Sequence, residues 1–307
     1  MTRFAKRISL FAATVALVFA VYARVFIGGE DSNFYRRFTS PPAPSLVVGS
    51  SRCAQGVVPA VINESELQFA RPLYNYCFTN GNSPYGPYYL ESIKKKLERR
   101  GDGLFLIEVN PWTLSVREKG ISENEFREAN RFIAEMKIVN NINPNLEYVL
   151  KRYNKAHYRT ILDDVLEHKG HSFLKKSGWL RINVDMSKNK VKKRIERKIK
   201  AYRKIAEEWS LSAKRIGYFG ETVSFLNEHG RVFVVRMPVS KEMLELEQTY
   251  APTFDSTVDS VVTASGGTYL DYSEDSGQYQ TTDGNHLWRK DAQRFNSQML
   301  DSLKFTF

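Results

Sequence analysis

Short apolar runs alternate with helical patterns along much of the chain. Each run consists mainly of aliphatic or aromatic residues bounded by Gly, Pro, Asn or Asp, which is typical of buried strands. The five predicted strands lie at 46–48, 73–77, 104–109, 232–235 and 268–271. Helical patterns between them, one opened by Pro87 and one over about 218–227, predict parallel strands with helices on both faces. We therefore expect an α/β domain: a three-layer, flavodoxin-like, parallel five-stranded sheet.

The pattern changes between the third and fourth strands. Residues 112–215 contain no convincing strand, and we expect a large helical insertion that forms a lid or cap. Two apolar stripes at helical spacing support this expectation. The first stripe is Leu146, Val149, Leu150, Tyr153, Ile161, Leu162, Val165 and Leu166; the second is Val191, Ile195, Tyr202, Ile205 and Trp209.

The amino terminus resembles an export signal. Arg3, Lys6 and Arg7 precede an apolar run over 8–22 that ends before Arg24. About 15 apolar residues is short for a membrane span, so a cleaved signal peptide competes with a signal anchor, which we prefer. We assign 1–29 to this segment, 30–44 to a linker and 45–307 to the folded domain. The domain is expected outside the cytoplasm, either anchored to the membrane through this segment or secreted after cleavage.

The distribution of charge limits the classes of partner that we expect. The 307 residues are 42% hydrophobic and carry a net charge of +11, but ten Lys or Arg and a single acid, Glu196, fall within 186–204. Export makes nucleic acid a poor partner for this basic helix. Its cations are expected to face anionic lipid or an anionic glycan, or simply solvent.

The two cysteines, Cys53 and Cys77, exclude a cysteine-built zinc site. We expect no metal and no cofactor. Both cysteines fall near the carboxyl ends of the first two strands, which should be neighbours in an oxidising compartment. A disulfide is expected there, with two buried free thiols as the alternative.

Chemistry-bearing residues follow the predicted strands. In an open parallel sheet the carboxyl ends of the strands meet at one edge, where ligands bind. A serine hydroxyl becomes a nucleophile when an imidazole takes its proton and a carboxylate orients that imidazole. The residues concerned are Gly49, Ser50, Ser51, Arg52, Asn80, Gly81, Asn110, Arg236, Asp283 and His286.

This arrangement resembles the SGNH (GDSL-like) hydrolase superfamily over roughly 45–114 and 218–300. The resemblance implies that Ser51 is the nucleophile and that Asp283 and His286 complete the triad. It also implies an oxyanion hole formed by the backbone amides of Ser51 and Gly81 and the side chain of Asn110, with Gly86 as a rival for Gly81. Two positions depart from the family pattern. Ser50 replaces the usual Asp, and the segment from Glu108 to Asn110 lacks a preceding glycine.

An exported SGNH-like domain behind a membrane segment resembles the proteins of teichoic acid D-alanylation and alginate O-acetylation. This likeness implies a serine acyl-esterase or O-acyltransferase that acts on a cell-envelope or extracellular polysaccharide through an acyl-enzyme. A membrane-bound O-acyltransferase is an expected partner. The alternative is a non-catalytic, membrane-tethered glycan-binding or assembly module on the same fold. In that case Asp283 would only cap a helix beginning near Leu287, and His286 would be a surface residue.

Four further residues are candidates for substrate binding. Trp112 and Trp288 follow Asn110 and His286 by two positions, and flat indole faces suit sugar rings. Arg52 and Arg236 follow strand ends and could attract an anionic substrate. The alternatives are ordinary packing for the indoles and pairing with structural carboxylates for the arginines.

Overall fold

The computed structural model describes residues 3–28, 34–117, 126–142, 145–152 and 172–306. Its centre is a parallel sheet in which the strands lie side by side in the order β2-β1-β3-β8-β9. All five predicted strands are confirmed, with ends that differ by at most two residues. The strands are β1 (Ser45–Val48), β2 (Leu73–Asn75), β3 (Gly103–Glu108), β8 (Gly230–Arg236) and β9 (Thr268–Asp271).

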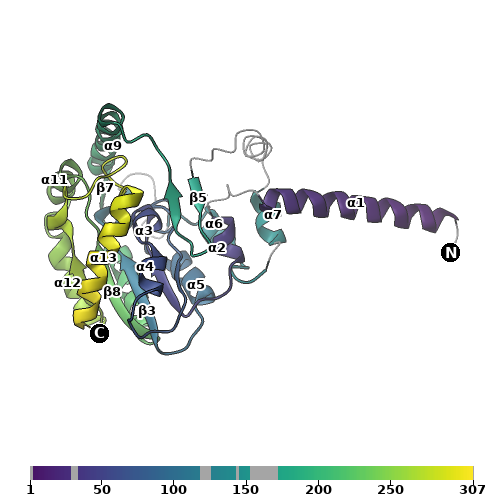
Figure 1. The fold of residues 1–307 in the computed structure, drawn as a ribbon, viewed down its shortest axis with the longest axis horizontal. Helices are drawn as coiled ribbons and strands as arrows, with labels where there is room; N and C mark the ends of the chain where they lie inside the picture. The colour runs from purple at the N-terminus through teal and green to yellow at the C-terminus, as the bar shows by residue number, and fades with distance from the viewer. Residues whose placement is uncertain (1–2, 29–33, 118–125, 143–144, 153–171, 307) are drawn as a thin grey trace.

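Helices cover both faces of this sheet (Figure 1). Because successive strand residues point to opposite faces, Leu46 and Val48 pack into one core and Val47 into the other. The first core contains residues of α5 (Pro87–Lys96), α10 (Ala213–Asn227) and α12 (Phe254–Ala264). The second contains residues of α3 (Ser51–Gly56), α4 (Pro59–Asn63) and α13 (Arg289–Thr306). The expected α/β arrangement with a parallel sheet is therefore confirmed.

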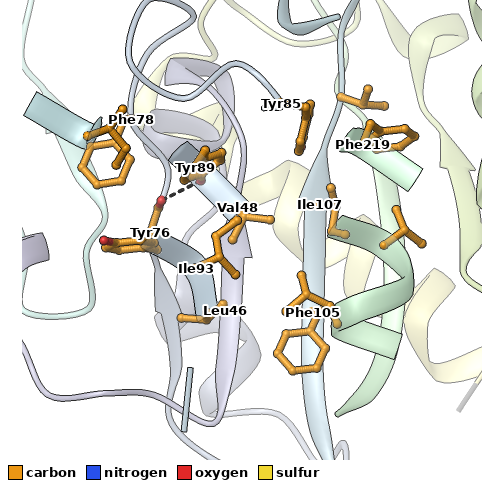
Figure 2. Packing of buried hydrophobic residues seen from close by; sticks show 14 of the residues in the cluster. Leu46, Val48, Tyr76, Phe78, Tyr85, Tyr89, Ile93, Phe105, Ile107 and Phe219 are labelled. Atoms are coloured by element: carbon orange, nitrogen blue, oxygen red, sulfur yellow. Dashed lines mark hydrogen bonds between the residues drawn. The ribbon is translucent and has the colours of Figure 1, made fainter. Parts of the chain in front are cut away.

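The first core is aromatic near the carboxyl end of the sheet. Figure 2 shows Tyr76, Tyr85 and Tyr89 around Val48 and Ile107. The Tyr89 hydroxyl donates to the carbonyl of Tyr76 at 2.8 Å and accepts from the N–H of Gly49 at 2.9 Å. This packing fixes the backbone at the point where β1 ends.

The insertion contains strands, which corrects the expectation that it holds none. β4 (Ser115–Arg117) pairs antiparallel with β7 (Trp209–Leu211), and β5 (Ser172–Leu174) with β6 (Leu180–Ile182). Strands of three residues are too short to show an alternating pattern. The helices among the described residues of 112–215 are η1 (Pro111–Thr113), α6 (Phe132–Glu135), α7 (Leu146–Arg152) and α9 (Lys188–Glu208), and α10 already begins at Ala213.

The two predicted apolar stripes have different outcomes. In α7, Leu146 and Leu150 are exposed and Tyr148 is buried. In α9, Ile199 packs against Val239 and Met243, as a surface helix with one apolar side should. Val149 also lies in α7, Ile195 and Tyr202 pack beside Ile199, Ile205 lies in α9 and Trp209 in β7, whereas Tyr153, Ile161, Leu162, Val165 and Leu166 lie outside the described residues.

The amino-terminal helix, α1 (Arg3–Gly28), extends away from the body (Figure 1). Its segment Arg3–Val21 has a mean hydropathy of 1.8, is long enough to cross a membrane, and has no buried share. These properties are compatible with a signal anchor or a signal sequence. Within the expected linker 30–44, residues 30–33 lie outside the described residues, and α2 (Tyr35–Thr39) carries Phe38, which stacks on Phe78 in the first core.

A disulfide joins Cys53 of α3 to Cys77, two residues beyond β2, with their Cα atoms 6.1 Å apart. Both side chains are fully buried in the second core. The predicted pairing is confirmed. It fixes α3, the helix that begins at Ser51, to the neighbouring strand.

Candidate active site

The turn between β1 and α3 presents Ser51. Gly49 has φ +139°, and a Cβ there would lie 2.8 Å from Glu108 Oε2, so only glycine fits this turn. Ser50 is fully buried, and its Oγ caps α3 by accepting from the N–H of Arg52 at 3.2 Å. Ser51 is partly exposed. Of the two adjacent serines, only Ser51 can offer its hydroxyl to a substrate.

The loop between β9 and α13 brings the predicted partners to this serine. His286 Nε2 lies 2.8 Å from Ser51 Oγ, and His286 Nδ1 lies 3.0 Å from both carboxylate oxygens of Asp283. Asp283 Oδ1 also accepts from the backbone N–H groups of Asn285 and His286 at 3.1 Å, which closes the loop. With Nδ1–H donating to the carboxylate, the lone pair on Nε2 faces the serine. This is the arrangement that proton transfer from Ser51 requires.

Asp283 is held as an anion. Burial alone raises the pKa of its carboxyl group, but the charge and hydrogen bond of His286, followed by those of Lys198, outweigh burial and lower the pKa far below its usual range. Lys198 comes from α9, with Nζ 2.9 Å from Asp283 Oδ2. A permanently ionised carboxylate stabilises the imidazolium that forms when His286 takes a proton.

Glu108 and Asn110 lie directly behind the nucleophile turn. Glu108 Oε2 accepts from the N–H of Ser50 at 2.8 Å, and Asn110 donates to Glu108 Oε1 at 2.6 Å and to Ser50 Oγ at 3.2 Å. Asn110 Oδ1 accepts from the N–H groups of Trp112 and Thr113, which caps η1. In this state both hydrogens of the Asn110 amide are therefore already bonded. Glu108 was not predicted as a site residue, although an acidic residue at the end of an apolar strand could have indicated one.

Gly81 lies in an exposed turn of the loop that follows β2. Ser83 Oγ donates to the carbonyl of Gly49 at 2.7 Å, and the N–H of Phe78 donates to the same carbonyl at 3.2 Å, so this loop is fixed to the nucleophile turn. Within the described part of the chain, nothing accepts from the backbone N–H of Ser51 or of Gly81. The rival, Gly86, is buried and faces the side chain of Glu128. Gly81 is the better placed of the two glycines.

The structure places three of the four candidate substrate residues in a buried charge cluster, which we call the Glu247 network. Glu247, from α11 (Lys241–Tyr250), is 1% exposed and accepts from the guanidinium of Arg52. It also accepts from Trp112 Nε1 at 2.6 Å and from Arg236 at 3.4 Å. Arg236 Nε lies 2.9 Å from Asp255 as well. Arg52, Trp112 and Arg236 are thus occupied with structural partners, and only Trp288 is partly exposed.

Asn285 connects this network to the triad. Its Oδ1 accepts from Arg52 Nε at 3.0 Å and from Nη2 at 2.8 Å, while its Nδ2 lies 3.2 Å from His286 Nε2. Asn285 was not singled out from the sequence. Its position between Asp283 and His286 gave no indication of a contact with Arg52, which is 233 positions away.

A cavity of about 1200 Å³ lies beside the triad, between α9, the start of α11 and the segment 277–281. Its walls combine aliphatic residues such as Ile195 and Ile199 with cations that include Lys192, Lys200 and Lys241. No triad residue lines it. Four exposed cations of the predicted basic helix line this cavity: Lys188, Lys192, Lys200 and Arg203.

A scan against models of known protein families and a search of curated proteins found no match for this chain. Among the residues that the structure describes, no group of three or more His, Cys, Asp or Glu side chains could hold a metal ion.

Proposed function

We propose that this chain is an SGNH-type serine acyl-esterase or O-acyltransferase that works outside the cytoplasm on a cell-envelope or extracellular polysaccharide. One observation carries the proposal. A partly exposed serine, an imidazole and an ionised carboxylate lie in hydrogen-bonded sequence, Ser51 Oγ to His286 Nε2 at 2.8 Å and Nδ1 to Asp283 at 3.0 Å. This geometry matches the requirements of covalent acyl transfer.

In the proposed reaction, Ser51 Oγ attacks the carbonyl carbon of an acyl ester while its proton passes to His286 Nε2. The tetrahedral oxyanion is held by the N–H of Ser51 and the N–H of Gly81, for which no acceptor is found among the described residues. Collapse releases the alcohol, which takes the proton from Nε2, and leaves an acyl-enzyme. His286 then activates a second acceptor: water for an esterase, a glycan hydroxyl for a transferase.

Two features outside the triad support this proposal. Counted along the chain, the strands of the sheet follow the order 2-1-3-4-5, a flavodoxin-like order whose ligand site lies at the carboxyl ends of strands one and three. Ser51 follows the first of these strands and Asn110 the second. The apolar segment Arg3–Val21 supports an exported, membrane-associated protein and hence an envelope substrate.

Covalent labelling tests the proposal. The full chain is treated with a fluorophosphonate, and the modified peptide is located by mass spectrometry. We expect one phosphonyl adduct on Ser51, none in Ser51→Ala, and slow labelling in His286→Ala. Ser256→Ala, which removes an exposed serine of α12, is the matched control and should label like the wild type. A folded wild-type chain that is not labelled would refute the proposal and favour the binding-module alternative.

A further inference from the structure

Two successive turns of α9 contact the loop that carries the acid and the base. Arg194 Nε donates to the carbonyl of Thr282 at 2.6 Å, and Lys198 Nζ lies 2.9 Å from Asp283 Oδ2. One turn further, the Tyr202 hydroxyl accepts from Asn80 at 3.2 Å. In Figure 1, α9 lies at the end of the body next to α11. One side of this helix therefore lies over the site.

Lys198, like Arg194, is less exposed than the other cations of α9. The side chains of Lys192, Lys193, Arg197 and Lys200 are exposed, whereas that of Lys198 is 29% exposed and its partner Asp283 is 17% exposed. An ion pair shielded in this way is screened less by salt than one in open solvent. Lys198 contacts Oδ2 of Asp283, whereas the backbone N–H groups of the loop donate to Oδ1.

We propose that Lys198 is a positioning residue of the active site. It holds the Asp283 carboxylate in the plane of the imidazole and weakens the attraction between that carboxylate and the imidazolium form of His286. The inference rests on the proposed function and extends it, because it makes α9, from the insertion, a working part of the triad. Electrostatics gives the reason. A cation on Asp283 offsets part of the negative charge that stabilises protonated His286, so removal of this cation should strengthen that stabilisation.

The other charged and titratable groups near Asp283 do not replace Lys198. His286 is its triad partner, and Arg52 reaches the loop only through Asn285. Arg194 contacts a backbone carbonyl. Burial, together with Glu247 and Asp283 nearby, raises the pKa of Tyr202 to about 12, so its hydroxyl is neutral in the working range. Among the described residues, only Lys198 forms an ion pair with Asp283 besides His286.

The test is the pH dependence of kcat/KM for a neutral aryl acetate, measured with the full chain between pH 5 and 9. In Lys198→Met, the acid limb should move to higher pH by about half to one unit, which lowers kcat/KM about three- to tenfold at acidic pH. The rate at alkaline pH should fall less. Lys198→Arg, which keeps the cation, should restore the wild-type limb, and Lys200→Met, on an exposed side of the same helix, should leave it unchanged.

The pH dependence of fluorophosphonate labelling gives a second readout that needs no ester turnover. If Lys198→Met unfolds, Lys198→Gln takes its place, with thermal unfolding as the check on both. An unshifted acid limb in a folded variant whose Ser51 is still labelled would overturn this inference and leave the proposed function intact. Absence of labelling in the wild type would instead refute the proposed function, and the role of Lys198 with it.

Discussion

Two clusters of polar side chains meet at the same edge of the sheet and have opposite properties. The Glu247 network is almost fully buried, with Arg52 at 2% and Glu247 at 1% exposed, and its arginines and indole surround one carboxylate. The triad is partly open, because Ser51 is partly exposed and its N–H has no acceptor among the described residues. Both clusters contain residues that follow strand ends. Proximity to that edge therefore does not separate a buried structural cluster from an accessible one, whereas exposure does.

Within the described part of the chain, few side-chain hydrogen bonds connect the Glu247 network to the triad. Among the described residues, Asn285 is the side chain that hydrogen-bonds to both, accepting from Arg52 and approaching His286 Nε2. Changes in the triad should therefore remove activity with little effect on stability, and changes in the network should do the reverse.

Removal of the nucleophile or the base should have the largest effect. Ser51→Ala and His286→Ala should each reduce ester turnover by about 10⁴-fold or more, and the double variant should be no worse, because these residues act as a unit. Single-turnover kinetics measure the ester turnover, and urea unfolding measures the stability. A folded Ser51→Ala variant with wild-type turnover would contradict the assignment.

Glu247→Gln should mainly destabilise the fold. It leaves the guanidinium groups of Arg52 and Arg236 buried without their shared carboxylate, a loss of about 3–5 kcal/mol in the free energy of unfolding. Urea unfolding at 25 °C measures it, with Glu245→Gln as the control on an exposed position of the same helix. Turnover per folded molecule should change far less. If activity fell while stability held, the network would belong to the catalytic machinery.

Loss of the disulfide should have an intermediate effect on stability. The Cys53→Ala/Cys77→Ala variant opens a loop between residues 24 positions apart, which should cost about 3 kcal/mol through the entropy of the unfolded chain. Unfolding of the variant is compared with that of the wild type under oxidising and reducing conditions. Equal stability of the oxidised wild type and the variant would show that the bridge contributes nothing.

The smallest effect concerns Lys96, a buried cation without a carboxylate among the described residues. Its Nζ donates to Ser40 O, Ser40 Oγ and Val139 O, and burial lowers the pKa of its ammonium group to about 7. Because the unfolded chain keeps this proton up to about pH 10 and the folded chain does not, stability should rise with pH between about 7 and 10. The slope should be at most about 1.4 kcal/mol per pH unit, since one proton is involved.

Lys96→Met should abolish this contribution. The measurement is the difference in unfolding free energy between variant and wild type at pH 6.5 and at pH 9, where other titrating groups cancel. The wild type should gain relative to the variant at the higher pH. Parallel stability curves would show that the ammonium group stays charged in its cage of oxygens.

The sheet and the triad were predictable because their signals are local. Each strand is an apolar run between breakers, and β9 coincides with its predicted range Thr268–Asp271. The ends of parallel strands must meet at one edge, so Ser51 and His286 were expected together. The three-residue spacing of Asp283 and His286 also suits a loop in which the carboxylate reaches Nδ1.

The remaining contacts were not predictable because each joins segments that are far apart along the chain, and no local pattern shows that these segments pack together. Glu247 lies on an amphipathic helix, and the sequence does not show which polar residues of such a helix face solvent and which are buried. Lys198 is one of ten cations within 186–204, and only the docking of α9 singles it out. The strands β4 and β7 pair across about 90 residues and are each too short to show a period.

The separation of Ser51 from His286 by 235 positions has a consequence for how activity arises. Ser51 follows the first strand of the sheet, whereas His286 follows β9, the edge strand that pairs only with β8 among the described strands. Under the proposed function, Ser51 therefore cannot be activated until this last strand has docked on the sheet. Contacts between residues so far apart are also the slowest to form. Recovery of Ser51 labelling during refolding should accordingly lag behind burial of the tyrosines in the first core.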